Sequence, residues 1–196
     1  MTSSAQPLLA IFVGGKSRRM GRHKGLLSAP GDSGPILEEL LRVGRAAGLD
    51  PVFVGDAAPY QHLAEGVICI EDDPPGAGPL AGLQAALRHA SSTGHSHVIA
   101  IACDMPYVTA EALEQARDHR SDATVVAPRR GPDAPWEPML ARYDAAGLAD
   151  VLANAISRGQ RSFQKLFASI EVEPLPLTPT VERALEDWDT PDDVAR

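Results

Sequence analysis

The stretch Leu8-Leu9-Ala10-Ile11-Phe12-Val13-Gly14-Gly15-Lys16-Ser17-Arg18-Arg19-Met20-Gly21-Arg22-His23-Lys24 decides the fold of this chain. Its first six residues are apolar and show no alternation with polar residues, which is typical of a strand buried on both faces. A glycine pair and a basic segment follow at once. A buried strand that opens into a glycine-rich loop predicts an α/β protein with a ligand site at the end of that strand.

Outward from this stretch, short apolar runs alternate with longer amphipathic ones. Pro35 precedes a run with leucines and isoleucine at i, i+4 spacing, and Thr109 is an N-cap candidate for a later helix. This rhythm predicts a three-layer α/β fold with a mostly parallel sheet. The expected strands are Leu8–Val13, Pro51–Gly55, Val67–Ile70, His97–Cys103, Ala123–Ala127, Met139–Tyr143 and a region at Glu171–Leu177; the expected helices are Pro35–Ala47, Leu80–Ala90, Ala110–Arg120, Ala145–Ser157 and Ser162–Ala168.

We expect one domain over residues 1–196. Residues 1–127 or so form a Rossmann-like, nucleotide-binding half, and residues 128–196 form an extension on the substrate side. The loops that begin at Gly14, Gly55, Glu71, Asp104 and Pro128 all follow strands, so they should share one edge of the sheet.

Composition excludes several classes of protein. With 44% hydrophobic and 22% charged residues, the chain is typical of a folded globular protein. Its formal net charge of −8 argues against a broad nucleic-acid or anionic-membrane surface. Cys69 and Cys103 each lie in an expected core strand, which predicts buried, reduced thiols. Together with a polar N-terminus unlike a signal peptide, this predicts a cytoplasmic protein.

The segment Gly14–Lys24 carries five formal positive charges in an acidic chain. Glycines let backbone N–H groups approach phosphate oxygens, and lysines and arginines neutralise their charge, so the segment predicts a phosphate cradle rather than a solvated basic loop. Gly15-Lys16-Ser17 resembles the end of a P-loop, but that motif needs glycine where Ala10 stands. Because Val98–Asp104 would serve as a Walker B strand, a P-loop ATPase or kinase stays an alternative, as does a nucleotide-binding regulator without catalysis.

Three groups of motifs carry a resemblance to a known family. They are Val13-Gly14-Gly15-Lys16-Ser17-Arg18-Arg19-Met20-Gly21 with Lys24-Gly25-Leu26-Leu27, then Gly78-Pro79-Leu80-Ala81-Gly82-Leu83 with Cys103-Asp104-Met105-Pro106, and finally Asp189-Thr190-Pro191-Asp192-Asp193. In this order they resemble the MobA-like nucleotidyltransferases, which include the molybdenum cofactor guanylyltransferases. The resemblance implies transfer of GMP from GTP to molybdopterin with release of pyrophosphate. It also implies Mg²⁺ and transient contact with molybdoenzymes or cofactor-delivery proteins.

The resemblance assigns roles to individual residues. Asp104 also stands out without it, since Mg²⁺ prefers carboxylates with phosphate oxygens and Asp104 ends a strand. The catalytic residues would be Lys24 and Arg19, and the metal ligands Asp104 and Asp189. Trp136, Asp187 and Asp189 would bind the acceptor. The nucleotide would be bound by Phe12, Val13, Gly14, Gly15, Lys24, Gly55, Asp72, Pro79, Leu80, Gly82 and Asp104.

The chain departs from the family pattern at three places. His23 replaces an acidic residue before the lysine, and Gly55 replaces an asparagine that contacts nucleotide in some relatives. Asp187-Trp188-Asp189 stands where the guanylyltransferase commonly has Asn-x-Asn. Aspartates there are more typical of the cytidylyltransferase relatives, so a CTP-dependent enzyme stays an alternative.

Asp72 could equally belong to an ordinary turn.

Overall fold

A computed structural model describes residues 6–13, 23–31 and 34–188. Within these residues, seven strands form one sheet in the order β3-β2-β1-β4-β6-β5-β7. The strands are β1 (Leu8–Phe12), β2 (Asp50–Val54), β3 (Ile68–Ile70), β4 (His97–Ala102), β5 (Val125–Pro128), β6 (Ala141–Asp144) and β7 (Glu173–Leu175). The expected α/β fold is confirmed.

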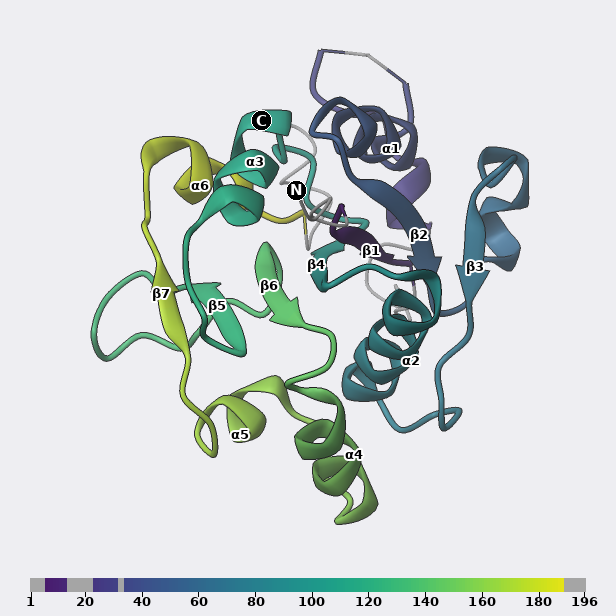
Figure 1. The fold of residues 1–196 in the computed structure, drawn as a ribbon. Coiled ribbons are helices and arrows are strands. Elements are labelled where there is room, and N and C mark those ends of the chain that lie inside the picture. The colour runs from purple at the N-terminus through teal and green to yellow at the C-terminus, as the bar shows by residue number, and fades with distance from the viewer. Residues whose placement is uncertain (1–5, 14–22, 32–33, 189–196) are drawn as a thin grey trace.

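Helices cover both faces of the sheet, which gives three layers (Figure 1). One face packs against α1 (Ile36–Ala46), α3 (Ala110–Asp118) and α6 (Pro179–Ala184). The other packs against α2 (Pro79–Thr93), α4 (Ala149–Ser157) and α5 (Phe163–Phe167). Two short 3₁₀ helices, η1 (Lys24–Leu26) and η2 (Ala58–Leu63), lie in connecting loops. In the part of the chain that the structure describes, the helices are too short or too polar to cross a bilayer.

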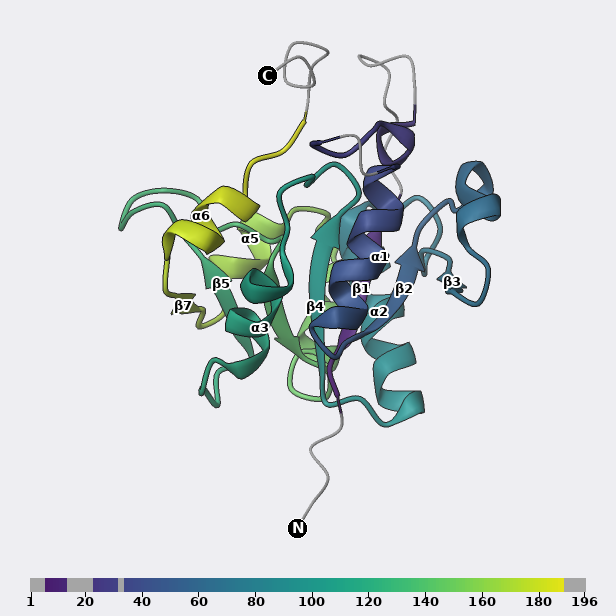
Figure 2. The ribbon, with the colours of Figure 1, turned by 90° about the horizontal axis from the view of Figure 1, so that it is seen from above.

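The middle of the sheet follows the expectation from the sequence. β1 is fully buried and pairs in parallel with both β2 and β4, so Phe12, Val54 and Ala102 lie in register at one edge. β2 in turn pairs in parallel with β3. The carboxyl ends of these four strands therefore form one continuous edge, seen at the top of Figure 2, and the loops after them are neighbours.

The second half of the sheet is less regular than a run of parallel strands. β6 is antiparallel to both β4 and β5 and lies between them, while β5 pairs in parallel with β7. The start of β6 therefore returns to the edge where β4 ends. The expected bounds also shift: the helix expected from Ala145 begins at Ala149, and η1, η2 and α6 were not expected.

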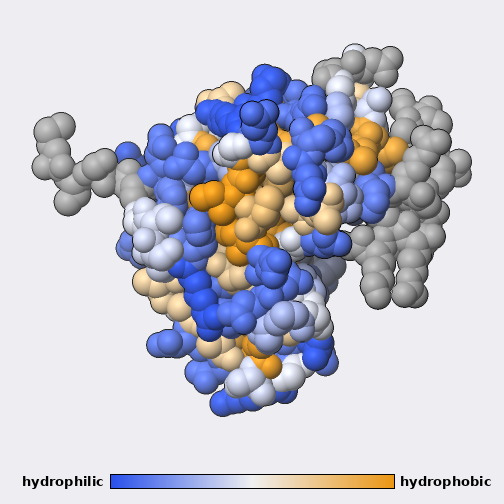
Figure 3. Space-filling view, turned by 90° about the vertical axis from the view of Figure 1, so that its right-hand side faces the viewer, coloured by the Kyte–Doolittle hydropathy of each residue, from blue (hydrophilic) through white to orange (hydrophobic). Residues whose placement is uncertain are grey.

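The prediction that both cysteines are buried is wrong for Cys69. Cys103 is buried, but Cys69 is exposed, because β3 is an edge strand with no described neighbour on its outer side. Ile68 beside it is 53% exposed, and the side of the molecule that β3 borders carries apolar surface (Figure 3).

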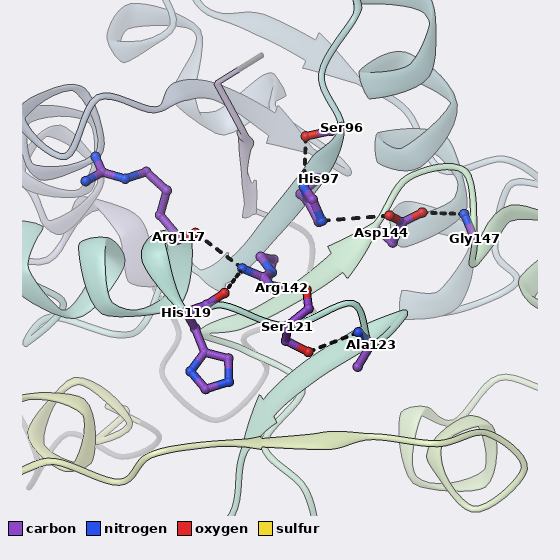
Figure 4. A network of polar contacts seen from close by, with 9 residues as sticks. All are labelled: Ser96, His97, Arg117, His119, Ser121, Ala123, Arg142, Asp144 and Gly147. Carbon is purple, nitrogen blue, oxygen red and sulfur yellow. Dashed lines mark hydrogen bonds and ion pairs between the residues drawn. The ribbon is translucent and has the colours of Figure 1, made fainter. Parts of the chain in front are cut away.

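A polar network joins β6 to the end of α3 and the turn that follows it (Figure 4). The guanidinium of Arg142, a buried residue of β6, donates hydrogen bonds to the carbonyl oxygens of Arg117, His119 and Ser121. These carbonyls belong to the end of α3 and the turn after it, where a helix leaves acceptors unsatisfied. Arg142 therefore closes the C-terminus of α3 and fixes α3 against the sheet.

Candidate active site

An ion pair lies at the edge formed by the carboxyl ends of β1 to β4. The Nζ atom of Lys24, in η1, is 2.8 Å from Oδ2 of Asp104, which follows β4. The two side chains are only 13% and 22% exposed. Their charges are therefore screened less by water than those of a surface pair. This contact brings together two residues that the sequence singled out and that lie 80 positions apart in the chain.

Backbone hydrogen bonds fix both partners of this pair. The N–H groups of Leu26 and Leu27 donate to the carbonyls of His23 and Lys24 at 3.0 Å each, which forms the turn that carries the lysine. The N–H of Cys103 donates to the carbonyl of Phe12 at 3.1 Å, which ties the end of β4 to β1. The ammonium and the carboxylate thus project from two segments that backbone hydrogen bonds hold in place.

The end of the described chain contacts the backbone of Asp104. The N–H of Trp188 donates to the carbonyl of Asp104 at 2.9 Å, and the Trp188 ring is only 5% exposed and packs edge-to-face against Tyr107. Asp187, expected at the acceptor, therefore lies one residue from a backbone contact with Asp104. The expected N-cap is also confirmed, since the Thr109 hydroxyl accepts from the Ala112 N–H at 3.2 Å, which leaves Asp104 outside the cap of α3.

Asp72 lies beside a cavity next to this edge. The cavity has a volume of about 490 Å³ and is lined by Gly55, Asp56, Ala57, Ala58, Gln61, Cys69, Glu71, Asp72, Pro75 and Gly76. Burial raises the pKa of Asp72, so its carboxylate is short of solvation. A carboxylate in this state gains most from a ligand that offers N–H or O–H donors.

The start of α2 faces the same region. Gly78 has φ 81°, a left-handed conformation that favours glycine, and Pro79 occupies the first turn. At Gly82 a Cβ atom would lie 3.0 Å from Oδ1 of Asp72 and 2.9 Å from Cε1 of Phe12. Glycine therefore allows α2 to approach both the sheet and this carboxylate. Leu80 is fully buried, so its side chain belongs to the core and only its backbone can face a ligand.

Phe12, Val13 and Gly55 also serve the framework of the site. Phe12 and Val13 are buried, and the N–H of Val13 donates to the carbonyl of Val54 at 2.9 Å. Gly55 has φ 104° and donates its N–H to the carbonyl of Ile70 at 2.8 Å. These residues shape the floor on which a ligand would lie.

Trp136 lies in the loop between β5 and β6. The guanidinium of Arg129 covers its ring at 4.3 Å from the centroid, a cation–π contact. Gln164 holds the backbone on both sides, because its Oε1 accepts from the Trp136 N–H and its Nε2 donates to the Trp136 carbonyl. One face of the indole is thus occupied, and any flat ligand would have to stack on the other.

Several expected site residues lie outside the described residues: Gly14, Gly15, Arg19 and Asp189. Within the described part of the chain, histidine, cysteine and carboxylate side chains form no group of three or more that could hold a metal ion. A cation that takes one protein carboxylate together with phosphate oxygens needs no such group, and the Asp104 carboxylate fits that donor set.

Tyr60 was not expected as part of this site. Tyr60 is 3% exposed and packs beside the lysine turn, with its ring 5.8 Å from that of His23. Its segment, between β2 and β3, has no helical or strand periodicity, so its burial could be found only from the structure. The same contact explains His23, whose ring packs edge-to-face on Tyr60.

Comparison with known proteins identifies the family of this chain. Residues 9–173 match the model of the MobA-like NTP transferase domain. The chain belongs to the MobA-like NTP transferase family. The match includes Lys24, Asp72, Gly82 and Asp104 and ends before Asp187.

Individual relatives align with most of the chain. It is 32% identical over 200 residues to a probable molybdenum cofactor guanylyltransferase of Opitutus terrae, an alignment that spans 98% of this chain and 96% of that protein. It is 36% identical over 160 residues to a protein of the same name from Mycobacterium bovis, across 80% of this chain and 76% of that protein. The crystal structure of molybdopterin-guanine dinucleotide biosynthesis protein A from Archaeoglobus fulgidus is similar at a TM-score of 0.74 and 28% identity, covering 95% of this chain and 94% of that one. This MobA-like chain is a nucleotidyltransferase.

Proposed function

We propose that this nucleotidyltransferase moves GMP from GTP to molybdopterin and releases pyrophosphate. The observation that carries the proposal is the shielded Lys24–Asp104 pair at 2.8 Å, at the edge where the glycine-rich segment after β1 must begin. The relatives named as molybdenum cofactor guanylyltransferases supply the substrate class.

In the proposed reaction, an oxygen of the terminal phosphate of molybdopterin attacks the α-phosphorus of GTP. A new phosphorus–oxygen bond forms, the bond to the oxygen that bridges the α- and β-phosphates breaks, and pyrophosphate leaves with that electron pair. The nucleophile is already an anion, so the site needs no strong base. Catalysis then rests on position and on neutralisation of charge.

We assign to Lys24 the neutralisation of charge on the phosphates. When a triphosphate enters, the ammonium group can turn from Asp104 towards the phosphate oxygens, with Gly14, Gly15 and Arg19 supplying further donors. Asp104 would then hold Mg²⁺, with Asp189 as a further ligand; when bound, Mg²⁺ neutralises charge on the phosphates and the leaving group. Asp72 would accept hydrogen bonds from the nucleotide at the cavity that it borders.

Residues 128–196 would form the acceptor side, where Trp136, Asp187 and Asp189 contact molybdopterin. We place the reaction in the cytoplasm, where GTP is available, with transient contacts to molybdoenzymes or cofactor-delivery proteins. Asp187-Trp188-Asp189 favours one second candidate, a CTP-dependent cytidylyltransferase. Parallel assays with GTP and CTP separate the two.

Pyrophosphate release with GTP, Mg²⁺ and molybdopterin tests the proposal. Lys24→Ala and Asp104→Ala should each lower turnover by about 10²-fold or more, because one electrostatic contact to the transition state has that magnitude. Lys165→Ala and Asp150→Ala, which remove the same charges from exposed positions, serve as matched controls. Near-normal turnover in Lys24→Ala with loss of activity in Lys16→Ala would instead favour the P-loop alternative.

A further inference from the structure

The lysine turn and the end of β4 are joined by a residue that the proposed chemistry does not use. Tyr60 of η2 lies between them and is 3% exposed. Its ring contacts His23 edge-to-face, with 5.8 Å between centroids and 74° between planes. A Cβ at Gly25 would lie 3.0 Å from Cε1 of Tyr60, so the ring lies directly on the backbone of the residue after Lys24.

The hydroxyl group of Tyr60 reaches both sides of the ion pair. Its oxygen lies close enough to the backbone N–H of Gly25 and to the thiol of Cys103 for both groups to influence the pKa of the phenol. Gly25 follows Lys24 and Cys103 precedes Asp104. One phenol group therefore links the two backbone segments that carry the ammonium and the carboxylate.

Both groups of this link are neutral near pH 7. Burial raises the pKa of Tyr60, and burial together with the Asp104 charge raises the pKa of the Cys103 thiol to about 11. Neither group is a base or a nucleophile under these conditions. What the link can supply is position, because a displacement of about 1 Å in a catalytic group can cost a large factor in rate.

We infer that Tyr60 is a positioning residue, whose ring and hydroxyl hold the Lys24 turn at a fixed distance from Asp104. The inference rests on the proposed function, in which Lys24 acts on the phosphates during the chemical step. In this inference, Tyr60 and Cys103 contact neither GTP nor molybdopterin. They act by positioning Lys24 and Asp104. Gly25 belongs to the same arrangement, because any side chain at this position would displace the ring of Tyr60.

Tyr60→Phe isolates the hydroxyl, because the ring and its packing remain. Tyr143→Phe is the matched control: Tyr143 is fully buried, and its hydroxyl donates to the carbonyl of Pro138 at 2.7 Å on the α5 side of the sheet. Both variants remove one hydroxyl group from a buried tyrosine, so their melting temperatures should fall by similar amounts. Only Tyr60→Phe should lower kcat, by about tenfold, with the KM for GTP changed less than about twofold.

Two further variants make the outcome decisive. Cys103→Ala removes the other end of the link with Tyr60 intact and should lower kcat by about threefold, again without a change in KM. Lys24→Ala, assayed alongside, reports on the proposed function itself. If Lys24→Ala is inactive while Tyr60→Phe and Cys103→Ala keep the kcat of Tyr143→Phe, the inference is overturned and the proposed function stands. If Lys24→Ala is active, the proposed function fails.

Discussion

Replacing Gly82 by alanine should damage the site more than the fold. The new Cβ would lie 2.9 Å from Cε1 of Phe12, 3.0 Å from Cγ1 of Val54 and 3.0 Å from Oδ1 of Asp72. Ordinary contacts between carbon atoms lie at about 3.5–4.0 Å, so α2 or its neighbours must move by about 0.5 Å or more. Overpacking of this kind costs about 1–3 kcal/mol. Alanine recovers about 1 kcal/mol through its higher helix propensity.

The net loss of stability for Gly82→Ala is therefore about 1 kcal/mol, which corresponds to a fall of about 2–4 °C in the melting temperature. The larger effect falls on the nucleotide, since the Asp72 carboxylate is one of the three groups displaced. Loss of one hydrogen bond to a charged group costs about 1.5–3 kcal/mol, or about 10- to 100-fold in Kd. Calorimetric titration with GTP in the presence of Mg²⁺ measures this.

Gly44→Ala is the control for this experiment. Gly44 lies in α1, and a Cβ there would clash with the side chain of Leu9. This contact lies on the face of the sheet opposite to α2 and Gly82. The variant should lose stability by a similar or larger amount while the Kd for GTP stays within about twofold. If Gly82→Ala binds GTP as tightly as Gly44→Ala does, Asp72 is not part of the nucleotide site and the assignment of this carboxylate is wrong.

Three other predictions concern the framework. Arg142→Met leaves carbonyls at the end of α3 without their donor and should lower the free energy of unfolding by about 3 kcal/mol in urea titrations, with turnover per folded molecule unchanged; a loss below about 1 kcal/mol would refute the capping role. Burial and the Arg142 charge lower the pKa of His97, against the opposing charge of Asp144, so the unfolded chain binds the proton first. The free energy of unfolding should therefore fall as the pH drops from about 7 to 5, and less so in His97→Gln; equal slopes would contradict this. Exposed Cys69 should react with a thiol reagent in the native protein, more slowly when GTP fills the adjacent cavity, while Cys103, whose pKa is raised to about 11, should react only on unfolding.

The sequence predicts the central strands and the meeting of Lys24 with Asp104 for a simple physical reason. Continuous apolar runs indicate strands covered on both faces, and the carboxyl ends of parallel strands share an edge. Loops after such strands must then be neighbours, whatever the residues between them do. The structure confirms that the two segments are neighbours and shows in addition that the two charged side chains form an ion pair at 2.8 Å.

The remaining features depend on long-range packing that local pattern does not encode. An apolar strand looks the same whether it pairs in parallel or antiparallel, so the place of β6 between β4 and β5 could not be derived. The run Val67–Ile70 has no alternation, yet it forms an edge strand and exposes Cys69. Tyr60 is one aromatic residue in an irregular loop, and only the folded chain shows that it contacts the lysine turn.

Transfer of label from GTP tests the central claim most directly. With GTP labelled at the α-phosphate, Mg²⁺ and molybdopterin, the label should appear in a dinucleotide that resists phosphatase, because the α-phosphorus becomes bonded to the acceptor. Label at the γ-phosphate should leave as pyrophosphate, and CTP should not replace GTP. Lys24→Ala should lower both the transfer of the α-label and the release of the γ-label by about 10²-fold or more. If the α-label stays in GDP, the account is contradicted: release of the γ-label as inorganic phosphate would indicate a hydrolase, and its transfer to the acceptor would indicate a kinase.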